Sequence, residues 1–263
     1  DLNRVDLIHR CHFDMIGGKF MSDEKSIFEL TSSHLNTGMR GIPVGTCRTS
    51  FVTPTEGVHY CGYPISELAS MLPEDVVYLL FNKELPTSDQ SSEFQNELKS
   101  RGSLPEGVEQ VLASLPRDGH PMDWLSIGIH TLGMLGGEGD WKSDALNLVA
   151  RMPRLLGLIF RYREGRVHNI PADDLSLGLV SRFTNTLDLD GIDRSVMDQV
   201  IATYLVLHMD HGGGNLSTFT GKAVASGHAT VYSSMAGAMN ALSGPLHGRA
   251  NQSCFEFVKK IGT

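Results

Sequence analysis

The sequence lacks the features that mark membrane-spanning, secreted and nucleic-acid-binding proteins. No apolar run reaches the roughly 18–20 residues that span a bilayer, and the first twenty residues carry three acidic side chains where a signal peptide needs an apolar core. Lysine and arginine total 22 against 30 aspartates and glutamates, a formal net charge of -8 at pH 7. Because contact with nucleic-acid phosphates needs a basic face, we expect neither a nucleic acid nor a membrane as partner.

Cysteine is also scarce. The four cysteines, Cys11, Cys47, Cys61 and Cys254, show no CxxC or CxxH spacing. This favours buried or incidental thiols in a reducing compartment over disulfides or zinc ligands, so we expect an intracellular protein. The GxSxG motif, the P-loop and a GxGxxG that opens a helix are absent as well, which argues against the enzyme classes that those motifs mark.

The pattern of the chain changes near residue 64 from short extended runs to helices. Runs such as Thr49–Val52 and Val58–Tyr60 predict small strands joined by turns. From Pro64 onward, helical patterns follow one another without alternating strands, which argues against a doubly wound sheet. We predict a mainly α-helical fold in two parts: a strand-and-loop region over residues 1–66, packed on a helical domain over residues 67–263.

Proline, capping residues and glycine predict where the helices begin and end. Pro73 opens one helix, and Thr87 to Gln90 fits a capping box whose helix closes at Gly102. Pro153 is expected to kink the longest helix. The other predicted helices begin at Pro105 and run over Pro121–Leu135, Trp141–Glu164, Leu175–Phe183, Val196–Leu207, Leu216–Ala225 and Val231–Leu242, with a last one from near Pro245.

Two glycine-rich joints between predicted helices contain histidine. The first is Asp210–Asn215, in which three glycines follow His211, and the second is Ser243–Gln252, which contains His247. Glycine lets a backbone approach a ligand closely and adopt positive φ, although the three glycines are also consistent with a permissive turn. The Asp-His pair of the first joint, or His208 with His211, could alternatively bind a metal. No spacing such as HExxH accompanies them, so we predict no metal site.

The expected position of His247 indicates a chemical role. Pro245 at the first helical position would place His247 in the first turn of the last helix. A helix N-terminus carries about half a positive charge, so an imidazole there tends to stay neutral and can donate a hydrogen bond. A neutral histidine of this kind can polarise a carbonyl and stabilise an enol or enolate. The alternative interpretation is a helix cap or a surface residue.

Both joints and the segments around them resemble the citrate synthase family. Asp-His-Gly-Gly-Gly-Asn at 210–215, Ser-Thr-Phe-Thr at 217–220 and the highly specific stretch Ala238–Gln252 follow Arg40–Thr46 and Gly57–Ile65, which resemble the strand-containing start of the family. The resemblance covers nearly the whole chain, as the amino-terminal part of a family member. It implies a multi-helical citrate-synthase-like large domain that is incomplete, with the small domain largely absent. The Gly-Pro-Leu-His-Gly form is closer to the mitochondrial-type branch, whose members are typically homodimers.

The resemblance implies a Claisen condensation of acetyl-CoA with oxaloacetate that gives citrate and CoA. His247 matches the histidine that hydrogen-bonds the acetyl carbonyl, and His211 matches a histidine that binds oxaloacetate. The aspartate base, a further histidine and the arginines that clamp carboxylates lie downstream in the family, so the chain as printed is expected to lack part of the active site. No cofactor is expected, with acetyl-CoA as co-substrate. The expected compartment is the cytoplasm, or the mitochondrial matrix in a eukaryote.

Two other functions stay open at this point. One is 2-methylcitrate synthase, which uses propionyl-CoA; one methylene in a pocket changes binding by only ~1–3 kcal/mol, so a few side chains decide between them. The other is a non-catalytic helical module that dimerises or binds an anion. The missing aspartate and arginines favour this module, and His211 and His247 argue against it. A polypeptide that ended near Thr263 is expected to show no synthase turnover.

Overall fold

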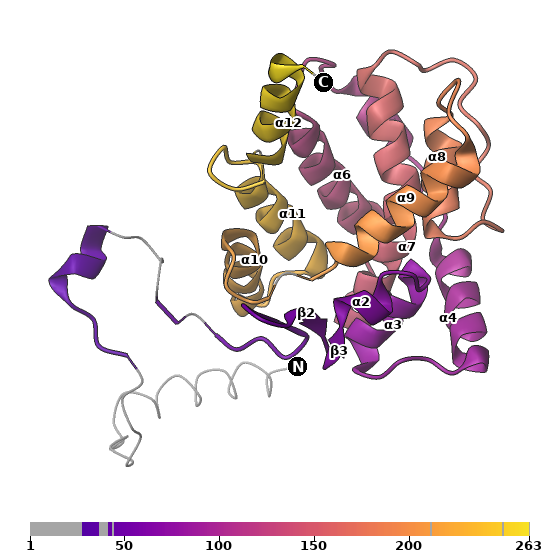
Figure 1. Ribbon diagram of the computed structural model, residues 1–263. Coiled ribbons are helices and arrows are strands. Elements are labelled where there is room, and N and C mark those ends of the chain that lie inside the picture. The colour runs from indigo at the N-terminus through magenta and orange to yellow at the C-terminus, as the bar shows by residue number, and fades with distance from the viewer. Residues whose placement is uncertain (1–27, 37–41, 44, 211, 249, 263) are drawn as a thin grey trace, which may run out of the picture. The chain divides into compact units, whose positions relative to one another are not determined.

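The structure is a computed structural model that describes residues 28–36, 42–43, 45–210, 212–248 and 250–262. Its contacts divide the chain into two units, Asp1–Val44 and Gly45–Thr263. Of the first unit, the described residues include one short 3₁₀-helix, η1 (Ser32–Asn36). Among the described residues, the strands and α-helices belong to the second unit (Figure 1). The division predicted near residue 66 stays a prediction.

The second unit is mainly α-helical, which confirms the predicted fold class (Figure 1). Its α-helices are α2 (Ile65–Leu68), α3 (Pro73–Asn82), α4 (Ser88–Arg101), α5 (Val108–Ser114), α6 (Pro121–Gly136), α7 (Trp141–Arg163), α8 (Leu179–Leu187), α9 (Arg194–Leu207), α10 (Leu216–Ser226), α11 (Val231–Leu242) and α12 (Ala250–Ile261). None of these helices is both long enough and apolar enough to cross a membrane. Pro153 lies inside α7, and the kink expected there stays a prediction.

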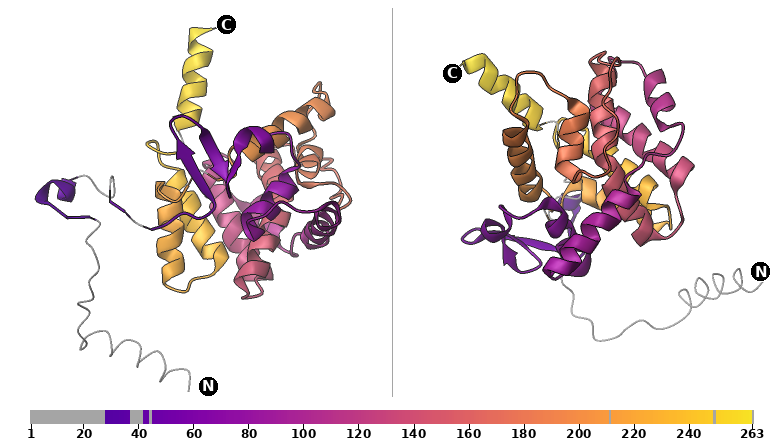
Figure 2. Two further views of the ribbon diagram at one scale, coloured as in Figure 1. Left: turned by 60° about the horizontal axis from the view of Figure 1, so that its bottom comes forward. Right: turned by 90° about the vertical axis from the view of Figure 1, so that its right-hand side faces the viewer.

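A small antiparallel sheet precedes the helices. It consists of β1 (Ser50–Thr53), β2 (Gly57–Tyr60) and β3 (Tyr63–Pro64), in the order β1-β2-β3 (Figure 2). The first two strands cover the runs that the sequence predicted as extended. Tyr60 at the end of β2 is fully buried in a cluster with Leu79 of α3 and Val206 of α9. The sheet is therefore packed on the helical part of this unit.

The main core lies where α5, α6, α7 and α11 meet. Its largest side chains, Trp124 and Leu132 of α6, Leu155 and Ile159 of α7, and Tyr232 of α11, are at most 2% exposed. Full burial of such a side chain stabilises the fold by about 1.5–3 kcal/mol. Helix α11 packs against both α6 and α10, so this core positions α10.

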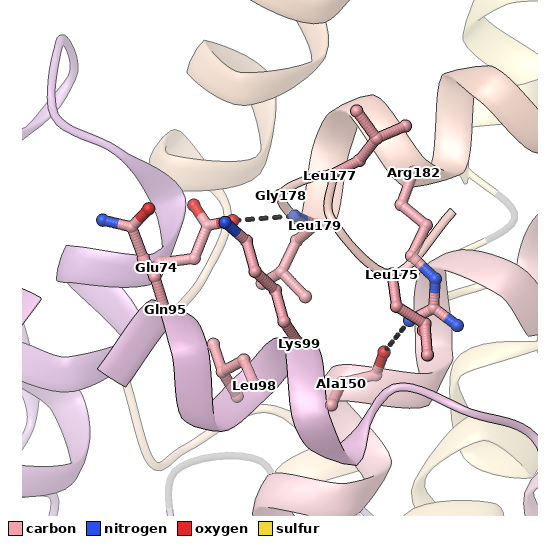
Figure 3. Close-up of a pocket in the computed structure, with 10 residues that line it drawn as sticks. All are labelled: Glu74, Gln95, Leu98, Lys99, Ala150, Leu175, Leu177, Gly178, Leu179 and Arg182. Carbon is pink, nitrogen blue, oxygen red and sulfur yellow. Dashed lines mark hydrogen bonds between the residues drawn. The ribbon is translucent and has the colours of Figure 1, made fainter. Parts of the chain in front are cut away.

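Helix α8 begins at Leu179 and not at Leu175, where the sequence pattern placed its start. Asp174 accepts hydrogen bonds from the N–H and the hydroxyl of Ser176, at 3.0 and 2.6 Å, and so holds a turn before the helix. Glu74 of α3, which is 5% exposed, accepts the Leu179 N–H at 2.7 Å (Figure 3). The cap of α8 thus comes from a residue more than one hundred positions away, which a local pattern does not reveal.

Arg182 then ties α8 to its surroundings. Its guanidinium is 3% exposed and donates two hydrogen bonds of 2.6 Å to the carboxylate of Asp173. It also donates to the carbonyl of Ala150 on α7 at 2.7 Å (Figure 3) and to that of Gly102 at 2.6 Å. One buried cation therefore holds α7, α8 and the end of α4 together.

Two further helix starts were placed too early by the sequence pattern. Helix α5 begins at Val108, because Pro105 forms a turn and Gly107, with φ of +94°, precedes the first helical residue. Helix α12 begins at Ala250 and not near Pro245. This second difference changes the environment of His247.

Candidate functional site

His247 lies in a turn and not in the first helical turn that the sequence predicted. After α11 ends at Leu242, the His247 N–H donates to the carbonyl of Gly244 and the Gly248 N–H donates to that of Leu242, both at 3.0 Å. Helix α12 starts only at Ala250. The predicted effect of its own helix terminus on His247 is therefore wrong.

The imidazole of His247 is held instead at the N-terminus of α10. The Ser217 N–H donates to Nε2 of His247 at 3.3 Å, and the Ser217 hydroxyl lies 3.1 Å from the same nitrogen. A ring nitrogen that accepts a backbone N–H carries no proton, which leaves Nδ1 as the donor of the ring. Ser217 is the second residue of α10, where backbone N–H groups have no partner within the helix. The N-terminus of α10, and not that of α12, therefore contacts the imidazole.

Asn215 forms the N-cap of α10. Its side-chain oxygen accepts the Thr218 N–H at 2.8 Å and the Ser217 hydroxyl at 2.7 Å. Its side-chain nitrogen donates to the carbonyl of Gly212 at 3.3 Å. Asparagine is among the residues preferred at this position, because its oxygen satisfies a free N–H of the first turn. Here it also ties the start of α10 to the glycine joint.

One of the three glycines in the first joint is required by the backbone geometry, and a second lies in a tight environment. Gly212 has φ of +84°, in the left-handed region that disfavours other residues. At Gly213, an added Cβ would lie 3.1 Å from the Cβ of Cys47 and 3.1 Å from Nζ of Lys222. Gly214 has open space at its Cβ position. Gly213 thus packs closely against Cys47 and Lys222, and the approach of this backbone to a ligand stays a prediction.

The first joint is anchored to β1 through Asp210. The Asp210 carboxylate accepts hydrogen bonds from the hydroxyls of Thr49 and Ser50, the second at 2.7 Å, and from the Gly212 N–H at 2.8 Å. The Asp210 N–H donates to the hydroxyl of Tyr60 at 3.3 Å. Thr49, Ser50 and Tyr60 lie 150 to 161 positions from Asp210 in the sequence, and nothing in the local pattern predicted these three partners.

A hollow of about 330 Å³ lies beside this joint. Its lining consists of Thr46, Cys47, Arg48, Thr49, Asp210, Gly212, Gly213, Thr218 and Lys222. Arg48 and Lys222 contribute two positive charges and Asp210 one negative charge, a local excess that favours an anion in a chain whose net charge is negative. Thr218 follows Ser217 in α10, so the residue that holds His247 adjoins this hollow.

Cys47 is a free, exposed thiol at the hollow, the second of the two alternatives, buried or incidental, that the sequence left open. Partial burial alone would raise the pKa of this thiol. Contacts of the sulfur with the Thr49 hydroxyl and with the backbone and hydroxyl of Ser50 outweigh that effect and lower its pKa from 9.0 to about 7. Such a thiol is substantially ionised near neutral pH, and the thiolate is the nucleophilic form.

His211 lies outside the described residues, so its predicted contact with a substrate stays a prediction. Among the residues that the structure does describe, no three His, Cys, Asp or Glu side chains are grouped in a way that could hold a metal ion. The sequence reasoning missed Ser217 and Asn215 as partners of the site. Asn215 did carry a local signal, since asparagine before an apolar helical run is typical of an N-cap.

The fold and the site together define a multi-helical protein in which one histidine accepts a backbone N–H at a helix N-terminus beside a glycine-rich joint. A family model described as "Citrate synthase, C-terminal domain" matches residues 38–263. The chain belongs to the citrate synthase family.

Individual relatives agree with this family. The chain is 32% identical over 250 residues to "Citrate synthase, mitochondrial" of Citrus maxima and 32% identical over 248 residues to "Citrate synthase, peroxisomal" of Saccharomyces cerevisiae, alignments that cover 85% and 84% of this chain. It spans about half of these relatives, 52% of each. The crystal structure of citrate synthase from Pyrobaculum aerophilum is similar with a TM-score of 0.79 at 26% identity, over 93% of this chain and 65% of that one.

Proposed function

We propose that the protein condenses acetyl-CoA with oxaloacetate and releases citrate and CoA, as a citrate-synthase-type acyltransferase. The observation that carries this proposal is the hydrogen bond from the Ser217 N–H to Nε2 of His247. Because Nε2 accepts this hydrogen bond, the ring carries its proton on Nδ1 and can donate that N–H to a carbonyl oxygen. A preorganised donor aimed at a developing enolate oxygen is a principal means of stabilising such a transition state.

In this reaction His247 donates a hydrogen bond to the thioester carbonyl oxygen of acetyl-CoA. A base removes one proton from the methyl group of acetyl-CoA, and the electron pair moves onto the carbonyl oxygen, which accepts the hydrogen bond from His247. The resulting nucleophilic carbon then forms a bond with the ketone carbon of oxaloacetate, whose oxygen takes up a proton. Water finally cleaves the thioester of citryl-CoA to citrate and CoA. The base is expected from the family resemblance to be an aspartate outside the sequence printed here.

Oxaloacetate is proposed to bind at the first joint, with His211 as one ligand. This assignment is supported by the positive charges of Arg48 and Lys222 at the hollow beside the joint. The N-terminus of α10, capped by Asn215, adds a partial positive charge on the same side. A dicarboxylate therefore meets local positive potential although the whole chain is acidic.

The proposal is tested by replacing His247 with alanine. Without the donor at the enolate oxygen, we expect kcat to fall by roughly 10²-fold or more, since a single such donor contributes on the order of 3–4 kcal/mol. The measurement is the release of free CoA thiol from acetyl-CoA and oxaloacetate at saturating concentrations. His168→Ala, at an exposed histidine before α8, is the matched control and should leave kcat unchanged. A near-normal kcat in His247→Ala would remove His247 from the chemistry.

Propionyl-CoA is the competing acyl donor, and its use would make the protein a 2-methylcitrate synthase. The two reactions share every step above, so His247 keeps its role in both. The ratio of kcat/KM for acetyl-CoA and propionyl-CoA separates them, and we expect acetyl-CoA to be preferred. A protein that binds oxaloacetate but releases no CoA from either thioester would instead be the non-catalytic module.

Homodimer formation and an intracellular compartment are proposed from the family alone. Small residues of α11 that could allow close contact between subunits pack inside the unit instead: Ala236 is fully buried and Ala238 is 6% exposed. The similar proteins named above are described as mitochondrial and peroxisomal, and the compartment of this protein is proposed to be of that kind. Light scattering at several protein concentrations measures the oligomeric state directly.

A further inference from the structure

We propose that Asp210 is a positioning residue for the imidazole of His247, acting through an unbroken series of hydrogen bonds that begins on β1. The role of His247 in catalysis rests on the proposed function above. The series of hydrogen bonds itself depends only on the geometry of described residues. From the sequence, Asp210 was considered only as half of a possible metal-binding pair with His211, an alternative that was not adopted.

The first half of the series fixes Asp210. Its carboxylate accepts from Thr49 and from Ser50, and Ser50 is only 6% exposed. Its N–H donates to the hydroxyl of Tyr60, which in turn donates to the carbonyl of Val206 near the end of α9 at 3.0 Å. Burial, together with the nearby charge of Asp210, raises the pKa of Tyr60, so its hydroxyl keeps the proton that it donates. Asp210 is thus held by both its backbone and its side chain.

The second half runs from Asp210 to the imidazole. The Gly212 N–H donates to the Asp210 carboxylate at 2.8 Å. The carbonyl of Gly212 accepts from the Asn215 side chain at 3.3 Å, and the oxygen of that side chain accepts from the Ser217 hydroxyl at 2.7 Å. The Ser217 N–H then donates to Nε2 of His247 at 3.3 Å. Every link belongs to the joint or to the first turn of α10, so a shift at Asp210 is passed to the group that orients the ring.

The position requires a carboxylate rather than any polar side chain. Asp210 receives three donors, from Thr49, Ser50 and Gly212, and an ionised carboxylate offers only acceptors. An asparagine has the same size, but one of its two polar atoms is a donor and would face a hydroxyl or an N–H. Asp210→Asn therefore removes part of the anchor without leaving a cavity.

A purely structural role for Asp210 would stabilise the joint without affecting His247, and a readout at the ring separates the two. In protein with ¹⁵N-labelled histidine, nuclear magnetic resonance reports which ring nitrogen carries the proton. We expect His247, assigned by its loss in His247→Gln, to show a protonated Nδ1 and an unprotonated Nε2. In Asp210→Asn we expect these resonances to shift toward a mixture of the two tautomers.

Ser91→Ala is the matched control. The Ser91 hydroxyl donates to Asp75 at 2.6 Å between α4 and α3, a bond of the same type away from the joint. We expect this variant to lose a similar hydrogen bond and to leave the His247 resonances unchanged. An unchanged His247 spectrum in folded Asp210→Asn overturns the proposal. If that variant does not fold, Ser50→Ala removes one donor, and a His247 spectrum without any shift is equally decisive against it.

Activity completes the test and keeps the two proposals apart. We expect Asp210→Asn to lower kcat by about 10-fold to 10²-fold, because small misplacement of a catalytic group has effects of this size. Turnover in the unmodified protein with an unresponsive His247 spectrum would defeat the positioning role alone. A responsive spectrum in a protein without turnover would support the positioning role while the proposed function fails.

Discussion

The three glycines of the first joint have different structural roles. Gly212 needs φ of +84°, whereas Gly214 has room for a side chain. We expect Gly212→Ala to lower the free energy of unfolding by about 1–2 kcal/mol, the cost of a left-handed conformation for an L-residue. Gly214→Ala should leave the free energy of unfolding unchanged or raise it by about 0.4–1 kcal/mol, because alanine lowers the conformational entropy of the unfolded chain. Urea denaturation of the two variants gives the comparison, and equal losses would contradict this account of the joint.

Cys47 offers a second prediction at the residue scale, which concerns pH. With its pKa lowered to about 7, its thiolate is present at lower pH than in an ordinary cysteine. The rate of alkylation by iodoacetamide should therefore rise through a midpoint near pH 7. Thr49→Val removes a hydrogen bond that lowers this pKa, so the midpoint should move to higher pH. Peptide mass spectrometry after timed alkylation measures the rate at Cys47.

The control for this prediction lies in the same sheet. Thr53 of β1 accepts the Glu56 N–H with its hydroxyl and has no hydrogen bond to Cys47 among those of the described residues. Thr53→Val should therefore leave the midpoint of Cys47 alkylation in place. Equal shifts in Thr49→Val and Thr53→Val would show that the sheet, and not the Thr49 hydroxyl, sets the reactivity of Cys47.

The residues of the site also show where sequence reasoning reaches its limit. The prediction that the N-terminus of the last helix acts on His247 was wrong, because that helix begins only at Ala250. The terminus that holds the ring belongs to α10, thirty positions earlier. Similarly, Asp210 meets Ser50 across 160 positions. Such pairings depend on how helices and sheet pack, which composition and spacing do not determine.

Among the helices, a start that is set by local residues could be predicted from the sequence, whereas a start that is set by a distant residue could not. Helix α4 starts where predicted, because Thr87 and Gln90 exchange hydrogen bonds of 3.3 and 2.9 Å in a capping box that is readable from the sequence. Helix α8 starts late because its cap, Glu74, comes from α3. Helix type and order could be predicted from apolar spacing, whereas a boundary set by a distant side chain could not.

Helix α8 also provides a prediction about stability. Arg182 is buried and bonded to Asp173 and to two carbonyls, so Arg182→Ala leaves a carboxylate and two acceptors without their donor. Breaking such a buried pair costs about 3–5 kcal/mol. We expect that loss in the free energy of unfolding from urea denaturation. Arg194→Ala, at the exposed start of α9, should change it by less than about 0.5 kcal/mol. Similar losses in the two variants would contradict the conclusion that Arg182 holds α7, α8 and the end of α4 together.

On the scale of the whole molecule, the small sheet and the helices of the second unit behave as one body around the first joint. Thr49 and Ser50 on the sheet side hold Asp210, and Tyr60 of β2 bridges Asp210 and α9. The strand region is therefore part of the support of the candidate site and not an appendage to the helices. A mutation in β1 is therefore expected to change the position of the first turn of α10. The Ser50→Ala experiment is based on this expectation.

The same unit carries a large apolar hollow of about 620 Å³ formed by α3, α7, α8, α9, α11 and the residues that follow α9. Among the residues that line it are Phe81, Met152, Phe183, Ile201 and Met235. Soluble proteins rarely leave a continuous apolar surface of this kind uncovered. We expect the hollow to bind the dye 8-anilinonaphthalene-1-sulfonate, whose fluorescence increases when water is excluded from its ring.

Neighbouring positions on α9 allow a matched test of that expectation. Ile201 lines the hollow, whereas Val200, which is 62% exposed, is not among its lining residues. A lysine at position 201 would bring a charge into the apolar wall, so Ile201→Lys should reduce the dye fluorescence severalfold. Val200→Lys adds the same charge one residue away and should leave the fluorescence close to that of the unmodified chain. If both substitutions reduce it equally, the dye responds to net charge and not to this hollow. If neither does, the hollow is covered in solution.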